Sequence, residues 1–394
     1  MKLIKMGCAG YKPFRNQVGI DLAPLTIFFG RNNSGKTALL RLPRLLLRCL
    51  SAKDYNNFSL DVDELTFGES FRDLIHTKLP AGHIDLSIIV EDAGKNFALD
   101  ARVQNVPSEE YQVVSSLHVK NPELSLEWDR KGGRPSSYSG QGPIEFHGLL
   151  PKIDDKVMMN DLNSWSQKVR LFEDSISHLG AHRSPISRVY EFKTPRILGL
   201  DGKGAPEWLA KYSELLEAVG DWYEQNMDGW RFSLDRTADF FRCVLRRGNV
   251  EVNLADTGDG MQLLLPVVVQ QLLHSQRNEL SFIDLIEEPE LHLHPAAHAS
   301  LADLFLQTVK NGKGQVIIET HSENLLLRLR RRIAEGANPD LVALYWIEDL
   351  NDGSSSIQRI NILSNGEVDY WPEGVFSETY QEVRALRRAA RKQR

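Results

Sequence analysis

The chain has 394 residues, of which 42% are apolar and 25% are charged. At roughly 150 residues per domain, this length allows two or three domains, or one large α/β domain with insertions. The composition is ordinary for a soluble globular protein and excludes wholesale disorder, collagen-like repeats and coiled-coil rods.

The net charge of −6 results from 47 basic and 53 acidic residues. This balance provides no overall attraction to nucleic acid or to an anionic membrane, so any DNA contact has to come from a local patch. No apolar run approaches the ~18 residues of a membrane span, and the N-terminus lacks the long apolar stretch of a secretory signal. Three widely spaced cysteines exclude a disulfide framework and a four-thiolate metal site. We therefore expect a protein of the reducing cytoplasm, with no membrane partner.

The first elements read as a strand, a glycine-containing loop and a helix. Residues 25–29 form a short apolar run that ends at Gly30, which is the pattern of a buried central strand. From Thr37 an apolar pattern continues as a helix. Pro43 lies inside this stretch and predicts a kink or a break there.

The middle of the chain changes character. Residues from about 84 to 128 alternate between apolar and polar types, which predicts antiparallel strands with one face in solvent. A loop rich in Gly, Ser and Pro follows at residues 132–143, residues 151–225 are expected to be mostly helical, and residues 240–254 to form a hairpin. The last third returns to an α/β pattern, with strands expected at residues 282–286, 316–319 and 341–347.

Residues 30–37, GRNNSGKT, match the phosphate-binding pattern G-x-x-x-x-G-K-S/T in full. Backbone N–H groups of such a loop form a nest for an anion, and the following helix adds its positive dipole end. Lys36 would reach the β- and γ-phosphates of ATP, and the Thr37 hydroxyl would ligate Mg²⁺. The alternative, a glycine turn with a surface lysine, is disfavoured by the strand before the loop and the helix after it. The residues expected to bind the nucleotide in this loop are Gly30, Asn32, Asn33, Ser34, Gly35, Lys36, Thr37 and Ala38.

A second apolar strand, at residues 282–286, delivers acidic residues at its carboxyl end, where open parallel sheets place ligands. We expect Glu287 to hold Mg²⁺ through water, and Glu288 to polarise the attacking water as the general base. The alternative is an acidic loop after a buried strand, which the phosphate-binding loop in the same chain disfavours. His321 follows a third apolar strand, and from there it would contact the γ-phosphate and sense its loss.

Gly258 and Gly260 precede a helix-like apolar run. Two glycines before a helix make an N-terminus suited to phosphate. Asp256 and Asp259 in the same segment would repel phosphate unless they point away. Taken alone, this segment reads as an ordinary turn between a hairpin and a helix.

Four motifs in this order resemble the ABC-type ATPase heads of the SMC and DNA-repair class. In that class they are Walker A, signature, Walker B with D-loop, and switch histidine. The residues of these motifs are more similar still to those of prokaryotic stand-alone AAA/ABC ATPases, which include the ATPase part of the OLD nucleases and several anti-phage defence ATPases. The segments that carry the resemblance are FGRNNSGKT at 29–37, ADTGDG at 255–260, IEEPELHLHP at 286–295 and ETHSE at 319–323.

The resemblance implies a head-to-tail homodimer, or a higher homo-oligomer, that closes around two ATP molecules. Gly258 and Gly260 of one subunit would then cap the γ-phosphate held by the other, and residues 292–295 would cross the interface. The chain departs from the family in having Glu287 where Asp is more usual. It also lacks the Ser-Gly-Gly core of transporter signatures and an identifiable Q-loop glutamine. Residues 179–185 resemble an element between the lobes, which would bring Arg183 near the site.

The partners follow partly from the resemblance. OLD nucleases carry a Toprim nuclease domain after the ATPase, and the stretch after His321 is too short for one, so we expect a nuclease or toxin effector to be a separate polypeptide. Two basic segments, the arginines within residues 328–332 and the tail at 384–394, would contact DNA or RNA phosphates or an acidic partner. A solvated helix face and a solubilising tail are the equally weighted alternatives.

These expectations combine into a two-lobed α/β P-loop ATPase head with a mixed or parallel sheet and an antiparallel β region. Its expected segments are an N-terminal lobe (1–150), a mostly helical insertion (151–245) and a C-terminal lobe (246–394). The leading function is an ATP-hydrolysing switch that controls an effector in anti-phage defence. The alternatives are a DNA-binding repair-type ATPase and an ATP-gated scaffold with little turnover. A kinase or transferase is a distant fourth, because the signature and the switch histidine have no role there.

Overall fold

The computed structural model describes residues 1–51, 58–107, 111–122, 125–129, 145–152, 156–194, 198–276, 281–310, 312–372 and Leu386. The predicted loop at 132–143 lies outside these residues, as do the basic residues of the predicted tail.

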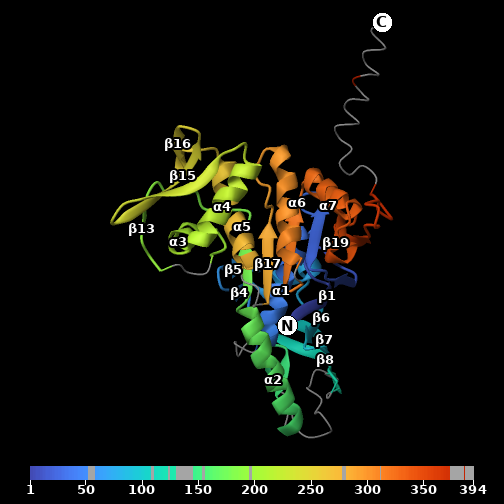
Figure 1. Ribbon diagram of the computed structural model, residues 1–394. Helices are drawn as coiled ribbons and strands as arrows, with labels where there is room; N and C mark the ends of the chain where they lie inside the picture. The colour runs from blue at the N-terminus through green and yellow to red at the C-terminus, as the bar shows by residue number, and fades with distance from the viewer. Residues whose placement is uncertain are drawn as a thin grey trace.

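A six-stranded, mostly parallel sheet forms the centre of the fold (Figure 1). Its strands, in spatial order, are β12 (Ile176–Leu179), β17 (Phe282–Glu287), β18 (Gly314–Thr320), β3 (Leu25–Gly30), β19 (Val342–Asp349) and β20 (Ser355–Ile360). Only β20 runs antiparallel to its neighbour. Because β17, β18 and β3 are adjacent and parallel, the carboxyl ends of these three strands reach the same edge of the sheet.

Helices cover both faces of this sheet. One face packs against α1, and the other packs against three helices that follow the signature segment. These helices are α1 (Lys36–Leu50), α5 (Asp259–Gln276), α6 (Pro295–Val309) and α7 (Glu323–Ala334). Neighbouring residues of β3 point to opposite faces, so Phe28 joins the α1 side whereas Ile27 and Phe29 join the other.

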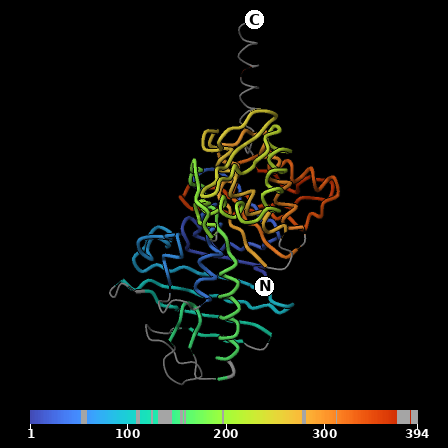
Figure 2. The backbone as a smooth tube through the Cα atoms, turned by 60° about the vertical axis from the view of Figure 1, so that its left-hand side comes forward, coloured from blue at the N-terminus to red at the C-terminus, as the bar shows by residue number. Residues whose placement is uncertain are grey.

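An antiparallel sheet of six strands lies beyond α1, and α2 (Lys156–Glu173) runs along it (Figure 2). In spatial order the strands are β2 (Val18–Asp21), β1 (Lys2–Ala9), β6 (His83–Asp92), β7 (Lys95–Val106), β8 (Tyr111–Lys120) and β9 (Ser125–Asp129). The prediction of antiparallel strands between residues 84 and 128 is confirmed, and the burial of β6 and β7 alternates as expected. Trp165 of α2 packs on Phe97 of β7, with ring centroids 5.0 Å apart.

A third, smaller sheet and two helices form the part of the molecule at the upper left of Figure 1. Its elements are β13 (Tyr190–Glu191), α3 (Ala205–Lys211), α4 (Ser213–Asn226), β14 (Arg231–Arg236), β15 (Phe240–Arg247) and β16 (Val250–Asn253). The predicted hairpin is β15 and β16. The prediction of mostly helix over 151–225 is only partly right, because β12 joins the central sheet and β13 joins this one.

Two short hairpins and four 3₁₀ turns complete the described elements. They are β4 (Asp61–Val62) with β5 (Leu65–Thr66), β10 (Glu145–His147) with β11 (Leu150–Lys152), and the turns Phe71–Leu74, His76–Lys78, Leu254–Asp256 and Pro339–Leu341. No helix in the described part of the chain is both long and apolar enough to cross a membrane. All three cysteines are buried, and none of them forms a disulfide.

Of the kink or break expected at Pro43, the structure excludes the break. The helix after the phosphate-binding loop continues through Pro43. A proline inside a helix costs about 3 kcal/mol, but burial of one leucine contributes roughly 1.5–3 kcal/mol, and seven leucines of α1 are buried. The strand before the phosphate-binding loop, β3, lies in the middle of the parallel sheet, separate from the antiparallel sheet. The division at residues 150 and 245 stays a prediction, and the sheets do not follow it.

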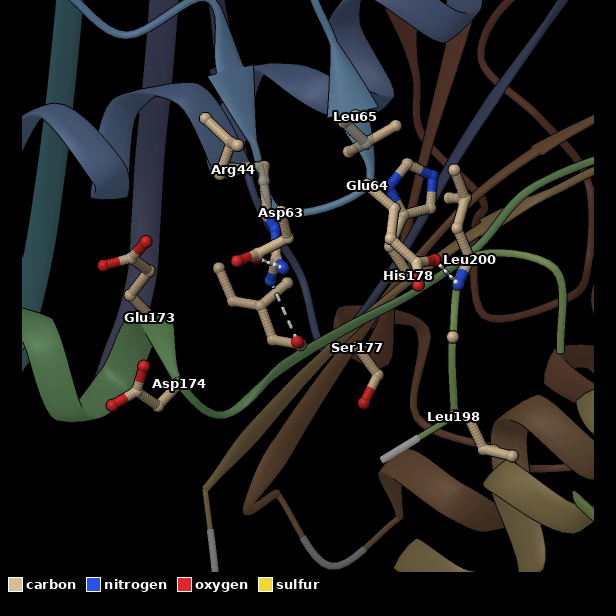
Figure 3. A pocket seen from close by; sticks show the side chains of 13 residues that line it. Arg44, Asp63, Glu64, Leu65, Glu173, Asp174, Ser177, His178, Leu198 and Leu200 are labelled. Carbon is tan, nitrogen blue, oxygen red and sulfur yellow. Dashed lines mark hydrogen bonds and ion pairs between the residues drawn. The ribbon is translucent and has the colours of Figure 1, made fainter. Parts of the chain in front are cut away.

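A polar cavity of about 330 Å³ lies where α1, the β4–β5 hairpin and β12 meet (Figure 3). Arg44 of α1 crosses it and donates to the carbonyl oxygen of Ile176 (3.0 Å) while pairing with Asp63. Glu64 accepts the backbone N–H of Leu200 at 2.9 Å. These contacts fasten the start of β12 to α1 and hold the edge strand in place.

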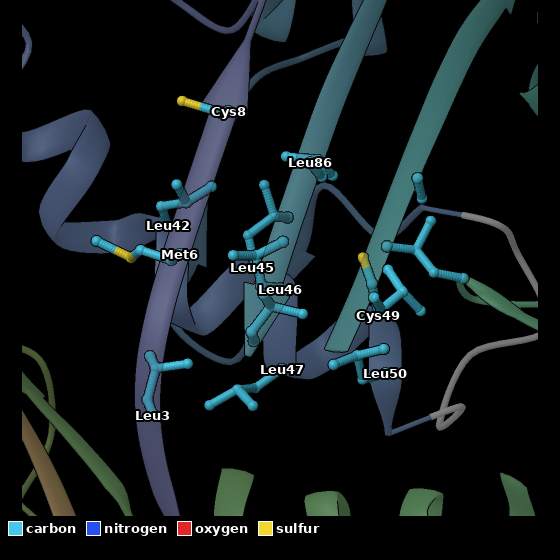
Figure 4. Packing of buried hydrophobic residues seen from close by; sticks show 14 of the residues in the cluster. Leu3, Met6, Cys8, Leu42, Leu45, Leu46, Leu47, Cys49, Leu50 and Leu86 are labelled. Atoms are coloured by element: carbon cyan, nitrogen blue, oxygen red, sulfur yellow. The ribbon is translucent and has the colours of Figure 1, made fainter. Parts of the chain in front are cut away.

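The apolar core between the two large sheets is built around α1 (Figure 4). Leucines of α1 pack against side chains of β1 and β6, and all of them are almost completely excluded from solvent. The side chains labelled in Figure 4 are Leu3, Met6, Cys8, Leu42, Leu45, Leu46, Leu47, Cys49, Leu50 and Leu86. This packing fixes the helix that begins at the phosphate-binding loop.

A buried carboxylate ties α5 to β17. Asp284 is fully buried, and its two oxygens accept from Gln270 Nε2 (2.6 Å) and Gln271 Nε2 (2.7 Å). His274 Nε2 lies 3.2 Å from Asp284 Oδ1. Burial of a carboxylate is unfavourable unless donors satisfy it, so these contacts make the docking of α5 specific.

We predict that Gln271→Met lowers the free energy of unfolding by about 2 kcal/mol, because one buried carboxylate oxygen loses its donor. Chemical denaturation followed by circular dichroism measures this change. The double variant with Asp284→Leu should lose less than the sum of the two single variants, since removal of the carboxylate removes the need for the donor. Strict additivity of the two substitutions would contradict the assigned coupling.

Candidate active site

The phosphate-binding loop connects β3 to α1, as the sequence predicts. All six residues of β3 are buried, so the loop begins from a fixed point. Gly35 has a φ of 98°, which glycine adopts without strain, and a Cβ there would lie 2.6 Å from Pro13 Cγ. Asn33 also has a positive φ, 63°. Left-handed residues within a loop are the geometry that turns backbone N–H groups into an anion-binding nest.

Lys36 begins α1, and its side chain is folded into the loop. Its Nζ donates to the carbonyl oxygens of Gly30 (3.2 Å) and Arg31 (2.9 Å). Burial lowers the pKa of Lys36, and the charges of nearby glutamates, Glu319 foremost, oppose that shift. The ammonium group is therefore held at the loop by carbonyl oxygens and by surrounding negative charge.

The Thr37 hydroxyl contacts a glutamate that the sequence reasoning did not select. Thr37 Oγ1 donates to Glu319 Oε1 at 3.0 Å, and Glu319 is 3% exposed on β18. Burial raises the pKa of Glu319 to about 7, the charge of Glu287 adds to this shift, and the hydrogen bond from Thr37 opposes it. The only sequence signal was its place two residues before His321, at the end of an apolar strand.

Glu288 and His321 lie together at the same edge of the sheet. Glu288 directly follows β17 with a φ of 40°, and its Oε1 is 3.6 Å from His321 Nε2. Burial and the charge of Lys36 lower the pKa of His321, while the charge of Glu288 opposes them. The predicted base, the predicted sensor and the lysine of the loop are thus brought to one place by three neighbouring strands.

Glu287, the predicted metal-side acid, is fully engaged by protein groups. Its Oε1 accepts from Arg41 Nε (2.6 Å) and contacts His178 Nε2 (3.0 Å), while its Oε2 accepts the backbone N–H of Ala181 (3.2 Å). Burial raises the pKa of Glu287, but the hydrogen bond with His178 and the charge of Arg41 outweigh burial and lower it to about 2. The carboxylate is therefore held ionised against α1 and β12.

Glu290 connects the segment after β17 to the end of β18. Its Oε1 accepts the Thr320 hydroxyl (2.5 Å) and the backbone N–H of His321 (2.7 Å). Burial raises the pKa of Glu290, and these two hydrogen bonds oppose the shift. The backbone that carries His321 is fixed in this way to the segment that carries Glu288.

Arg183, which the resemblance brings near the site, braces the same segment from behind. Its Nη2 donates to the carbonyl oxygens of Glu287 and Glu288, the latter at 3.1 Å, and its Nη1 donates to that of Leu263 at 3.4 Å. The side chain is 7% exposed. Burial lowers the pKa of Arg183 to about 10, against the charges of the surrounding glutamates, so it remains a cation.

The signature segment lies at the N-terminus of α5. A Cβ at Gly260 would lie 2.4 Å from the carbonyl oxygen of His292, so only glycine permits this close approach, whereas Gly258 faces open space. Asp256 is ion-paired with Arg188. A cavity of about 560 Å³ adjoins both glycines and residues 292–297.

The arginines of α7 are engaged within the molecule rather than presented as a free basic face. Their partners are Asp303 for Arg328 and Arg332, Glu335 for Arg331 and Arg332, and the carbonyl oxygen of Gly366 for Arg330. These contacts favour the alternative interpretation of this segment, a solvated helix face. They do not favour a role in binding nucleic acid.

ATP and Mg²⁺ fit the donor set of this site. Ser34 Oγ and Glu319 Oε2 are buried and have no hydrogen-bond partner among the described residues. Hydroxyl and N–H donors suit phosphate oxygens, and hydroxyl and carboxylate oxygens suit Mg²⁺. Within the described ranges, no three His, Cys, Asp or Glu side chains form a metal cluster.

Comparison with known proteins agrees with this geometry. Residues 151–326 match the AAA ATPase domain family. The DNA replication and repair protein RecF of Geobacter sp. (strain M21) is 33% identical over 108 residues, which is 26% of this chain and 28% of that protein. The chain thus matches little more than a quarter of the length of this curated relative.

Solved structures share the fold at low sequence identity. An SMC head bound to the C-winged helix domain of ScpA has a TM-score of 0.54 at 14% identity, covering 91% of this chain and 98% of that chain. The SMC head domain from Thermotoga maritima has a TM-score of 0.46 at 13% identity, covering 92% and 100% of the two chains. The first likeness confirms the predicted fold, which is that of an SMC head.

We predict that Arg183→Met lowers the free energy of unfolding by about 2 kcal/mol, because buried carbonyl oxygens at the end of β17 lose a charged donor. Thermal and chemical denaturation measure the loss. Arg188→Met is the matched control, since Arg188 lies in the same segment but pairs with Asp256 on the surface. Equal stability of the two variants would contradict the bracing role of Arg183.

Proposed function

We propose that the protein binds and hydrolyses ATP and works as a molecular switch. The observation that carries this proposal is the convergence of Lys36, Glu288 and His321 at one edge of the central sheet, with 3.6 Å between the last two side chains. A loop that binds phosphate without hydrolysis has no need for a paired carboxylate and imidazole. The fold of an SMC-type head supports the same function.

The arrangement supports a direct chemical route. Glu288 orients a water molecule and accepts its proton as the water oxygen bonds to the γ-phosphorus and the bond to the β–γ bridging oxygen breaks. Lys36 offsets negative charge on the phosphates, and Thr37 with a nearby carboxylate would hold Mg²⁺. The ion supplies further neutralisation of the phosphate charge. His321, whose pKa is lowered, remains neutral near pH 7 and can exchange a hydrogen bond with the γ-phosphate.

The proposed switch is a head-to-tail homodimer, or a higher homo-oligomer, that closes on ATP. Gly258 faces open space at a helix N-terminus, which suits contact with a phosphate held by a second subunit. Because Asp256 is ion-paired, its charge repels phosphate less strongly than the sequence alone indicates. ATP favours the closed form only to the extent that it binds that form more tightly.

We further propose that the closed dimer controls a separate effector protein, a nuclease or toxin, in prokaryotic anti-phage defence. This step rests on the resemblance of the Walker B and switch segments to stand-alone defence ATPases. Action in the cytoplasm fits three buried cysteines without a disulfide.

A DNA-binding repair-type ATPase is the second candidate, and the similarity to RecF favours it. The α7 arginines weigh against a DNA face there, because each already has a partner. An ATP-gated scaffold with little turnover is the third, and the Glu288–His321 contact weighs against it.

We predict that Lys36→Ala weakens ATP binding at least about tenfold, since one charged contact with phosphate contributes about 1.5–3 kcal/mol. Glu288→Gln should retain ATP binding and lose about 10²–10⁴-fold in turnover, the range of a general base. Fluorescence titration with an ATP analogue and phosphate release measure the two effects. Wild-type turnover equal to that of Glu288→Gln, with ATP binding intact, would favour the scaffold instead.

We predict that duplex DNA leaves the ATPase rate unchanged within about twofold at physiological salt, because the arginines of α7 already have partners within the protein. The measurement is phosphate release with and without DNA at several salt concentrations. Strong, salt-sensitive stimulation would raise the repair-type ATPase above the effector-controlling switch.

A further inference from the structure

We propose that Glu319, rather than Glu287, is the carboxylate that joins Thr37 in holding Mg²⁺. This assignment rests on the proposed ATP-binding function and deepens it. It concerns which of two neighbouring strands provides the metal-side acid. The assignment has four supporting parts: the contact of Thr37, the unsatisfied oxygen of Glu319, the protein partners of Glu287, and the order of the strands.

The first part is the contact of the loop hydroxyl. Thr37 Oγ1 donates to Glu319 Oε1 at 3.0 Å, so this hydroxyl and this carboxylate already share one small volume. A cation that accepts the Thr37 oxygen as a ligand is therefore within reach of Glu319 without a change of strand or helix. Glu319 is 3% exposed, which leaves its carboxylate few other orientations.

The second part is an unsatisfied oxygen. Glu319 Oε2 is buried and has no hydrogen-bond partner among the described residues. A buried carboxylate oxygen without a donor is costly, and a bound cation removes that cost. Mg²⁺ needs only one or two protein carboxylates, because phosphate oxygens and water complete its octahedral shell.

The third part is the engagement of Glu287. Its Oε1 receives Arg41 and His178, and its Oε2 receives the backbone N–H of Ala181. For Glu287 to serve the ion, an Arg–carboxylate pair and a buried histidine contact would have to be given up. Glu319 loses only the hydrogen bond from Thr37, and both groups of that bond become ligands.

The fourth part is topology. β18 is the direct neighbour of β3, where Glu319 pairs with Phe28, whereas Glu287 lies one strand farther away and pairs with Glu319. The strand next to the phosphate-binding loop therefore supplies the closer acid. In this arrangement Glu287 is a positioning residue that fixes Arg41 and His178 behind the site.

The test compares Glu319→Gln with Glu287→Gln, and binding of a fluorescent ATP analogue is measured in EDTA and in Mg²⁺. In Glu319→Gln we expect the affinity in EDTA to be preserved and the gain from Mg²⁺ to fall by about tenfold or more. In Glu287→Gln we expect that gain to be preserved and the unfolding temperature to fall. Mn²⁺ binding with a non-hydrolysable ATP analogue, followed by electron paramagnetic resonance, should show the same order.

Glu319→Asp is the control for folding, since it retains a carboxylate and should recover part of the metal dependence. An unchanged Mg²⁺ dependence in Glu319→Gln, or its loss in Glu287→Gln alone or in both variants, would overturn the assignment while leaving ATP binding in place. No nucleotide binding by the wild-type protein would overturn the proposed function, and the assignment with it.

Discussion

Mutual repulsion among buried carboxylates is the constraint around which this site is built. Three of them, Glu287, Glu290 and Glu319, are buried where β17 and β18 end, and the half-buried Glu288 lies beside them. Three cations of different origin surround them. Arg41 comes from α1, Arg183 from the segment after β12, and Lys36 from the phosphate-binding loop. Each cation also fixes backbone or side-chain geometry, so charge balance and positioning are achieved by the same contacts.

The distribution of these cations separates two kinds of carboxylate. Glu287 has a direct cationic partner, and its pKa is lowered to about 2, whereas that of Glu319 is raised to about 7 by burial and by its neighbour. Groups whose environments push their pKa values apart usually serve different ends. Here one carboxylate stabilises the protein framework, and the other stays poorly satisfied beside the phosphate-binding loop. This asymmetry agrees with the proposed role of Glu319 as a ligand of Mg²⁺.

The sequence predicts the parts of this site that local patterns encode. The phosphate-binding loop, the strands that end at Glu287 and before His321, and the hairpin at 240–254 all follow from short runs of residues, and the structure contains them. The role proposed for Glu319 did not follow, because it depends on the order and register of three strands, and β3 lies far from β17 and β18 in the sequence. The same holds for the pairing of Arg41 with Glu287, 246 positions apart.

Two other outcomes have the same physical origin. A proline predicted a kink or a break at residue 43, but the helix continues there because burial of the leucines around it on two sheets outweighs the local penalty. Four arginines within residues 328–332 suggested a basic face, but Asp303 and Glu335 neutralise most of it from neighbouring positions in space. In both cases tertiary contacts reverse a local preference, and no window of sequence contains those contacts.

The signature segment packs closely on residues 292–295, and this packing connects the proposed dimer contact to the proposed hydrolytic site. A methyl group at Gly260 would meet the carbonyl oxygen of His292, so the start of α5 lies directly against residues 292–295. His298 then bridges the Leu293 carbonyl oxygen (3.1 Å) and the Ser322 hydroxyl (2.8 Å), and Ser322 directly follows His321. In a head-to-tail dimer, a phosphate held by the partner subunit would contact Gly258. Its effect would pass through a short chain of contacts to His321, which is proposed to sense the phosphate bound by its own subunit. Because such coupling is reciprocal for binding free energies, occupancy of one site would favour the signature geometry that completes the other.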